Sequence, residues 1–441
     1  MLWGGLLALP GGLIAQNGPL RVSPDGTHLQ YRADGCPFFY LADTAWELLH
    51  RCDRQELRHY LTTRKRQGFN VVQCVILAEL DGLTVPNAAG ALPLRDFDPT
   101  RPEEAYFRHV DFAVGLADSL GMYLALLPTW GDKFNRKWGV GPEIFTPENA
   151  AVYGRFLAER YRDAPVIWLL GGDRNPENAE DLAIVRSMAA AMRAVTGQRQ
   201  LYTYHPQGGS SSVDFFAEDD WLDFHMFQSG HGGRDSYANF DLVRDALRTD
   251  TTRPVINGEP QYEDHPINWR PANGWFDDAD TRQAAYWSVL AGAKGHTFGN
   301  HNIWQMWLPG REPISRARTP WLTALHYPGA AQMGHLRKLL EVVDFAGLVR
   351  NDGLLVDAPN SGGRVVIATR HADTGALLAY TPYGDALTLR VADLPPNTSA
   401  RWYDPRTGNY VPTHEVPTGS TVTYDPPYDP ARGNDWVLVV E

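Results

Sequence analysis

Short apolar runs alternate with amphipathic stretches from residue 38 to about residue 340. The amphipathic stretches have helical spacing over roughly 12 to 18 residues, and this alternation predicts a parallel sheet covered by helices. Eight strands are predicted, at 38–46, 69–77, 122–130, 166–173, 200–206, 222–228, 254–260 and 295–300. Eight is the number of parallel strands that closes a (β/α)8 TIM barrel, so the fold class is predicted to be α/β.

The intervening segments have the pattern of barrel helices, which are predicted at 54–68, 103–121, 148–161, 177–195, 239–248 and 279–293. Gly68, Gly121 and Gly197 follow helix ends, where a left-handed cap is needed. Residues 21–38 contain two turn signals, Pro-Asp-Gly and Ala-Asp-Gly, and are predicted to form a hairpin that plugs the bottom of the barrel.

The period changes after about residue 345 to short alternating runs separated by Gly, Pro, Asn and Asp. Such runs predict a small antiparallel β-sandwich. The predicted organisation is therefore an apolar segment at 1–19, a catalytic barrel at 20–344 and a β-sandwich domain at 345–441, which we interpret as a packing domain.

The amino-acid composition limits the kinds of molecule that the protein is expected to bind. The chain has 441 residues, 43% of them apolar, and a net charge of -12, which argues against nucleic acid as a partner. The segment 1–19 is apolar, but it lacks basic residues at its start, is broken by Pro10 and is too short to cross a membrane. We expect a cytoplasmic protein or, if this segment is the remnant of a signal, a periplasmic or secreted one. The sequence does not indicate an oligomeric state.

Two carboxylates are the main candidates for chemistry. Asp173 ends the apolar run VIWLLGGD and Glu259 ends PVINGEP, on the predicted fourth and seventh strands. Barrel enzymes keep their catalytic groups at the C-terminal ends of strands, and hydrolysis of a glycosidic bond needs two carboxyl groups. The structural alternatives are a helix cap for Asp173 and an ion pair with a barrel arginine for Glu259.

Other polar and aromatic residues at the strand ends are candidates for substrate binding. They are Asp43, Trp46, Trp130, Lys133, His205, His225, Gln228, Tyr262, Asn300 and Trp304. The 14 tryptophans and 19 tyrosines exceed what a core requires, and flat aromatic faces suit sugar rings. No metal or other cofactor is expected, because the first strand has no histidine and glycines surround His231.

The runs FFYLADTAWELLHR, GFNVVQCVIL, LLPTWGDKF, VIWLLGGDRNPEN and VINGEPQYED resemble glycoside hydrolase family 140, the apiosidase-like barrels. The likeness covers about residues 20–340, and the remainder resembles the β-domain labelled as collagen-binding that follows the barrel in this family. The resemblance implies that Asp173 is the acid/base and Glu259 the nucleophile. It further implies a glycosidase of plant pectic polysaccharide, rhamnogalacturonan II, that releases apiose or a related pentofuranoside.

These observations lead to two hypotheses. The first is a retaining glycosidase in which the nearby negative charge of Glu259 raises the pKa of Asp173. The long segments 79–101 and 131–145 after the second and third strands are expected to wall in a pocket, which favours exo action. The second is a protein that binds carbohydrate, or is only structural, on a barrel that has lost turnover.

Overall fold

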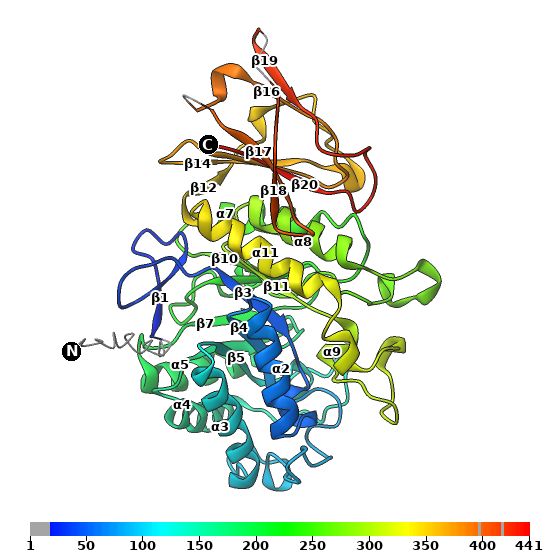
Figure 1. Ribbon diagram of the computed structural model, residues 1–441. Coiled ribbons are helices and arrows are strands. Elements are labelled where there is room, and N and C mark those ends of the chain that lie inside the picture. The colour runs from blue at the N-terminus through cyan, green and yellow to red at the C-terminus, as the bar shows by residue number, and fades with distance from the viewer. Residues whose placement is uncertain (1–17, 396–397, 416–418) are drawn as a thin grey trace, which may run out of the picture.

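The computed structural model describes residues 18–395, 398–415 and 419–441, so all but the last two residues of the predicted segment 1–19 lie outside the described residues. The chain forms a parallel β/α barrel followed by an antiparallel β-domain (Figure 1). Among the described residues, no helix is both long enough and apolar enough to span a membrane.

The eight predicted barrel strands are confirmed. They are β3 (Tyr40–Thr44), β4 (Val71–Leu77), β5 (Tyr123–Thr129), β6 (Val166–Gly171), β7 (Tyr202–His205), β9 (His225–Gln228), β10 (Val255–Asn257) and β11 (Gly295–Phe298). The sheet runs in the order β7-β6-β5-β4-β3-β11-β10-β9, with the short β8 (Ser210–Ser211) antiparallel to β9. Between β7 and β9 the Asp223 N–H donates to the Tyr202 carbonyl at 2.9 Å. This contact nearly closes the barrel.

The six predicted barrel helices are also present. They are α2 (Arg54–Arg66), α3 (Glu104–Ser119), α4 (Pro147–Arg160), α5 (Ala179–Thr196), α7 (Ala238–Thr249) and α8 (Asp278–Leu290). Capping side chains help to fix where these helices start. At the start of α2, for example, the Asp53 carboxylate accepts the N–H groups of Gln55 and Glu56. The alternation of apolar and amphipathic segments did not predict α11 (Pro328–Val342) or the short helices α1 (Leu48–Arg51), α6 (Val213–Phe216), α9 (His301–Trp304) and α10 (Trp321–Ala324).

Side chains alternate between the inside and the outside of the barrel. On β3, Tyr40 and Ala42 join the interior cluster, whereas Leu41 packs against the helices. The predicted hairpin is present as β1 (Leu20–Val22) paired with β2 (Leu29–Tyr31), and its leucines Leu20 and Leu29 join the interior cluster. In Figure 1 the hairpin lies at the left of the barrel and α9, which follows the end of β11, at the right. The C-terminal ends of the barrel strands therefore lie at the end opposite the hairpin.

The C-terminal domain consists of two antiparallel sheets. The larger has the order β12 (Leu348–Arg350), β14 (Ile367–His371), β15 (Leu377–Thr381), β20 (Trp436–Val440), β17 (Ala400–Asp404) and β18 (Asn409–Pro412), and the smaller β13 (Leu355–Val356), β16 (Leu387–Arg390) and β19 (Thr421–Tyr424). Leu378 and Val437 belong to the barrel-side cluster, whereas Ala379 and Leu438 belong to the core between the sheets. The central strands are buried on both faces for this reason.

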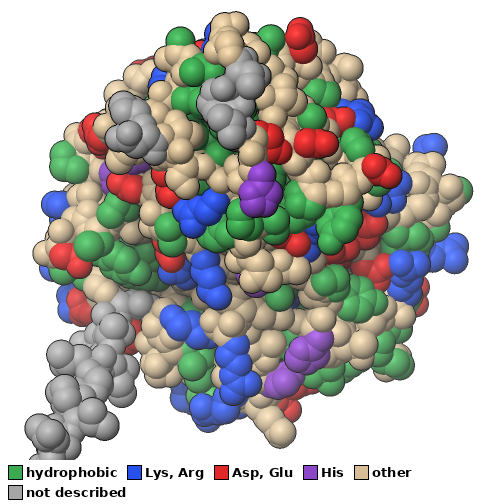
Figure 2. Space-filling model, turned by 45° about the horizontal axis from the view of Figure 1, so that its top comes forward, with side chains coloured by type: hydrophobic (Ala, Val, Ile, Leu, Met, Phe, Trp, Pro, Cys, Tyr) green, Lys and Arg blue, Asp and Glu red, His purple; other side chains and the backbone are tan. Residues whose placement is uncertain are grey.

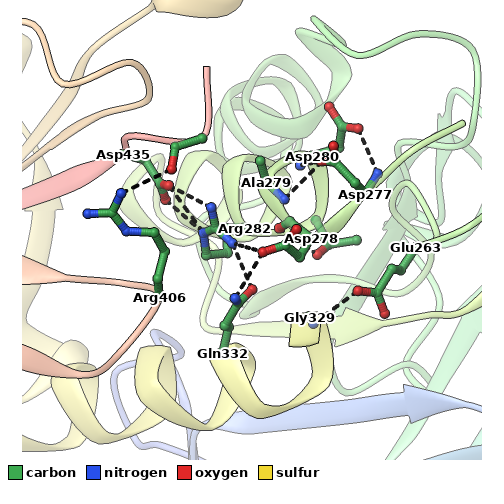
Figure 3. A network of polar contacts seen from close by, with 12 residues as sticks. Glu263, Asp277, Asp278, Ala279, Asp280, Arg282, Gly329, Gln332, Arg406 and Asp435 are labelled. Carbon is green, nitrogen blue, oxygen red and sulfur yellow. Dashed lines mark hydrogen bonds and ion pairs between the residues drawn. The ribbon is translucent and has the colours of Figure 1, made fainter. Parts of the chain in front are cut away.

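Helix α8 lies between the barrel and the C-terminal domain (Figure 1). Its Arg282 donates to Asp435 of the domain, at 2.8 Å from Nη2 and at 3.0 Å and 3.2 Å from Nε. Arg282 also contacts Asp278 and Gln332 (Figure 3). Tyr286 stacks on Tyr380 with ring centroids 4.8 Å apart. With the C-terminal domain turned forward, the surface mixes acidic, basic and apolar side chains (Figure 2).

Candidate active site

A cavity of about 520 Å³ opens at the C-terminal ends of the barrel strands. Asp173, after β6, and Glu259, after β10, both line it. The aromatic side chains that line it are Trp46, Trp130, Trp138, Tyr262, Trp269 and Trp304. Two carboxyl groups thus share one cavity with aromatic walls, the kind of surface on which sugar rings stack.

The backbone that carries Asp173 is strained. Gly171, Gly172 and Asp173 have φ angles of 92°, 114° and 53°, all in the left-handed region. A Cβ at Gly172 would lie 3.0 Å from the Cα of Trp130 and the N of Gly131. Helix α5 is capped by Asn178, so Asp173 does not serve as a helix cap. An aspartate held in this conformation at a cavity is a reason to look for function there.

The environment of Asp173 favours its protonated form. Burial and the negative charge of Glu259 raise the pKa of Asp173 to about 6, against the opposing effects of His205 and Arg174. The indole Nε1 of Trp138 donates to Oδ2 of Asp173 at 2.9 Å, and Arg174 Nη1 lies 3.8 Å from the same oxygen. Asp173 is therefore suited to give up a proton near neutral pH.

Glu259 has the opposite environment. Burial by itself would raise its pKa, but contacts with His205 and His231 outweigh it and lower the pKa to about 2. His231 Nε2 is hydrogen-bonded to Oε1 at 3.2 Å, and His205 Nε2 lies 3.2 Å from Oε2. The partners of Glu259 are thus two histidines and not the barrel arginine of the alternative interpretation.

His205 lies between the backbone of Asp173 and the carboxylate of Glu259. Its Nδ1 accepts the backbone N–H of Asp173 at 3.2 Å, so a neutral ring carries its proton on Nε2, which faces Glu259. The ring packs against Trp46 and Trp130, with centroids 5.2 and 6.1 Å away. These contacts keep the imidazole in position between the two strand ends.

Several predicted residues lie at the cavity, and others do not. Besides the two carboxyl groups, Trp46, Trp130, Gln228, Tyr262 and Trp304 line the cavity, and His205 lies behind Glu259. The structure places four others elsewhere: Asp43, Lys133, His225 and Asn300.

The side chains of Asp43 and His225 lie away from the cavity for two different reasons. The side chain of Asp43 points outward from β3, because its register on the strand turns it to the helix layer. There it contacts Tyr60 and Arg64 of α2. His225 begins β9 rather than ending it, so it lies near the bottom of the barrel and contacts Asp250 at 2.9 Å.

Lys133 and Asn300 are near the cavity but are engaged in structural contacts. The Lys133 ammonium is buried 2.8 Å from both carboxylate oxygens of Asp132. Asn300 accepts the N–H of Asn302 as the cap of α9 and donates to Glu263. Both side chains therefore hold loops, and we leave them out of the proposed set of substrate contacts.

Sequence reasoning missed three kinds of residue at this site. His231 was discounted because of its neighbouring glycines, yet its loop turns the ring onto Glu259. Trp138 and Trp269 are 37% and 51% exposed. Their position in polar loops was the sequence signal for a role in binding, since a tryptophan in such a loop does not serve a core. Glu79 lines the cavity after β4, where burial and the charges of Asp173 and Asp132 raise its pKa to about 8.

Among the described residues, one group could bring three ligand atoms together for a metal, namely Glu47, His50 and Asp81. Arg51 lies against it, with Nε 3.3 Å from Glu47 Oε2 and Nη2 3.6 Å from Asp81 Oδ1. The guanidinium already neutralises these carboxylates and would repel a cation. The three residues are not part of the cavity lining.

Comparison with known proteins assigns the class. One solved structure, described as a glycoside hydrolase, is 30% identical, with a TM-score of 0.87 over 96% of this chain and 97% of that one. A glycoside hydrolase family 5 structure from Bacteroides vulgatus ATCC 8482 is 29% identical, with a TM-score of 0.86 over 96% and 94%. These matches place the protein among the glycoside hydrolases.

The family match is more specific. Residues 23–346 match the family described as "Apiosidase-like, catalytic domain", and the chain belongs to that family. Residues 349–441 match "Putative collagen-binding domain of a collagenase". The endo-β-1,4-mannanase of Thermotoga petrophila, 13% identical with a TM-score of 0.50 over 88% of this chain and 91% of that one, shares the fold alone. A search of curated proteins gave no match.

Proposed function

We propose that the protein is a retaining glycosidase in which Glu259 attacks the anomeric carbon and Asp173 is the acid/base. In the first step Asp173 protonates the leaving oxygen while a bond forms between Glu259 and the sugar. In the second step Asp173 takes a proton from water, which displaces Glu259. The observation that carries the proposal is the contrast between the raised pKa of Asp173 and the lowered pKa of Glu259 at one cavity.

The low pKa of Glu259 supports its role as the group that stays ionised. The nucleophile of a retaining glycosidase must be a carboxylate while its neighbour is protonated. His205 and His231 stabilise that ionised form from two sides.

We propose a pentofuranoside, apiose or a relative, as the sugar released from plant pectic polysaccharide. Membership of the apiosidase-like family supports this choice. Exo action is supported by the walls of the cavity, which include Glu79 and Trp138 from the two long loops after β4 and β5.

The test is to make Asp173→Asn and Glu259→Gln and to assay both on defined side chains of rhamnogalacturonan II. Each variant should lose about a hundredfold or more in kcat. An aryl glycoside whose leaving group needs no protonation should restore the first step of Asp173→Asn but not that of Glu259→Gln. Retention is checked by NMR, which identifies the anomer of the first-formed product.

The matched controls are Asp163→Asn and Glu177→Gln, at side chains that are 72% and 45% exposed. Both should keep the activity of the parent protein. A loss smaller than about tenfold at Asp173 or Glu259 would exclude the assigned role of that residue. Binding of the oligosaccharides without any product would instead favour the non-catalytic hypothesis.

A further inference from the structure

Trp138 makes a direct polar contact with Asp173 besides lining the catalytic cavity. Its indole Nε1 donates to Oδ2 of Asp173 at 2.9 Å, so the polar edge of the ring is directed at the proposed acid/base. The guanidinium of Arg174 covers the ring, with its central carbon 4.0 Å from the ring centre. A tryptophan that served only as a platform for a sugar ring would need neither contact.

The loop that carries Trp138 is held in place on both sides of the indole. Arg174 donates from Nε to the carbonyl of Asn135 at 2.8 Å and from Nη2 to the carbonyl of Trp138 itself. Oδ2 of Asp132 accepts the backbone N–H groups of residues 140 and 141 at 3.0 and 2.8 Å. The side chains of Arg174 and Asp132 are fully buried, so the loop is anchored from below although part of the indole is exposed.

The two carboxyl oxygens of Asp173 have different surroundings. Oδ2 accepts the indole N–H and lies 3.8 Å from Nη1 of Arg174. Oδ1 makes no hydrogen bond with any of the residues that the structure describes, and the side chain is 21% exposed.

This difference determines which oxygen of Asp173 carries the proton. In a protonated carboxyl group one oxygen is an O–H donor and the other remains an acceptor. An N–H donor and a positive charge beside Oδ2 both favour Oδ2 as the acceptor. The proton is therefore left to Oδ1.

We propose that Trp138 is the positioning residue of Asp173, in that its N–H holds Oδ2 so that Oδ1 carries the proton and transfers it to the leaving oxygen. In the first step the Oδ1–H bond breaks, its electron pair stays on Oδ1, and the proton forms a bond with the leaving oxygen. In the second step Oδ1 takes a proton from the attacking water. This inference rests on the proposed function and deepens it, because it assigns the proton transfer to one oxygen of Asp173.

The test is Trp138→Phe, which keeps an aromatic ring in the cavity wall and removes the N–H. Carboxyl NMR on the full chain without substrate measures the pKa of Asp173. The N–H favours the ionised form, so the variant should raise this pKa above about 6. The other charged or titratable groups around Asp173 stay in place, namely Glu79, Arg174, His205 and Glu259.

Kinetics separate a positioning residue from a wall of the cavity. For Trp138→Phe we expect kcat to fall about tenfold and KM to stay within about twofold, with the basic limb of the kcat profile at higher pH. An aryl glycoside whose leaving group needs no protonation should restore the first step nearly to the parent rate. A residue that only forms the wall would lose affinity for both substrates and leave the basic limb in place.

The matched control is Trp269→Phe, at another tryptophan of the cavity that makes no hydrogen bond to Asp173 within the described part of the chain. It should leave the pKa of Asp173 and the basic limb as they are in the parent protein. An Asp173 pKa that is unchanged or lower in Trp138→Phe would overturn the proposal, and so would an equal loss of kcat on both substrates. The proposed function fails separately, through full activity of Asp173→Asn, because the NMR titration tests the Trp138 contact without turnover.

Discussion

Asp173 and Glu259 differ in pKa because their neighbours differ. Asp173 is buried beside a negative charge, whereas Glu259 is buried beside two histidines. Burial raises the pKa of any carboxyl group, so the histidines decide which of the two stays ionised. Activity should fall as the pH rises through about 6, because Asp173 then loses the proton that it must donate.

The electrostatic contact between the two groups can be tested on its own. Glu259→Gln removes a negative charge and should lower the pKa of Asp173 below about 6, although burial keeps it above the value of a free aspartate. The titration of Asp173 by carboxyl NMR checks this shift, with Glu177→Gln as the control that leaves the pKa in place. An Asp173 pKa that stays the same or rises would mean that the two groups are not neighbours.

At the scale of elements, the turn after β6 determines where Asp173 lies. Gly171 and Gly172 allow the chain to leave the strand with positive φ angles, close against the backbone of Trp130 and Gly131. The turn exposes Asp173 at the cavity and brings its N–H to His205. A glycine pair before a strand-end carboxylate is therefore part of the geometry of the site.

Replacing Gly172 with alanine should lower both stability and activity. The new Cβ would meet Trp130 and Gly131 at 3.0 Å, and the positive φ costs roughly 1–2 kcal/mol for any residue other than glycine. The control is Gly115→Ala in the exposed face of α3, where a Cβ meets nothing within 4 Å and stability should rise by about 0.5–1 kcal/mol. Chemical unfolding measures the change in stability of both variants. Equal changes in the two variants would show that the turn after β6 is not strained.

At the scale of the whole molecule, the barrel and the C-terminal domain are joined through a buried polar contact. The side chains of Arg282 and Asp435 are 1% and 2% exposed and form a bidentate pair across the interface (Figure 3). Buried pairs of this kind are costly to break, because the remaining charge is left without a partner. The contact makes the position of the domain specific.

Arg282→Met should therefore destabilise the protein by about 3–5 kcal/mol, and Asp435→Leu added to it should recover part of the loss. Thermal or urea unfolding measures the difference. The control is Arg401→Met, in a pair with Glu441 whose side chains are 40% and 43% exposed, which should cost at most about 1 kcal/mol. A double variant less stable than Arg282→Met alone would contradict the explanation by an unpaired charge.

The sequence alone determined the fold class and the position of every barrel strand, since the alternation of apolar runs with amphipathic stretches depends only on local spacing. It also determined that Asp173 and Glu259 lie just after strands, because each carboxylate comes shortly after an apolar run. Helix α11 was missed because it follows the last strand, where the alternation that predicted the other helices stops.

Only the tertiary structure decided which polar residues meet. Asp43 and His225 follow the same kind of sequence pattern as Trp46 and Gln228. Strand register turns Asp43 to the helix layer, and His225 lies at the start of its strand rather than at the end near the cavity. His231 and Trp269 reach the site through loops whose path depends on left-handed turns and on packing against other loops. Local spacing contains no information on such contacts, because they join residues that lie far apart in the chain.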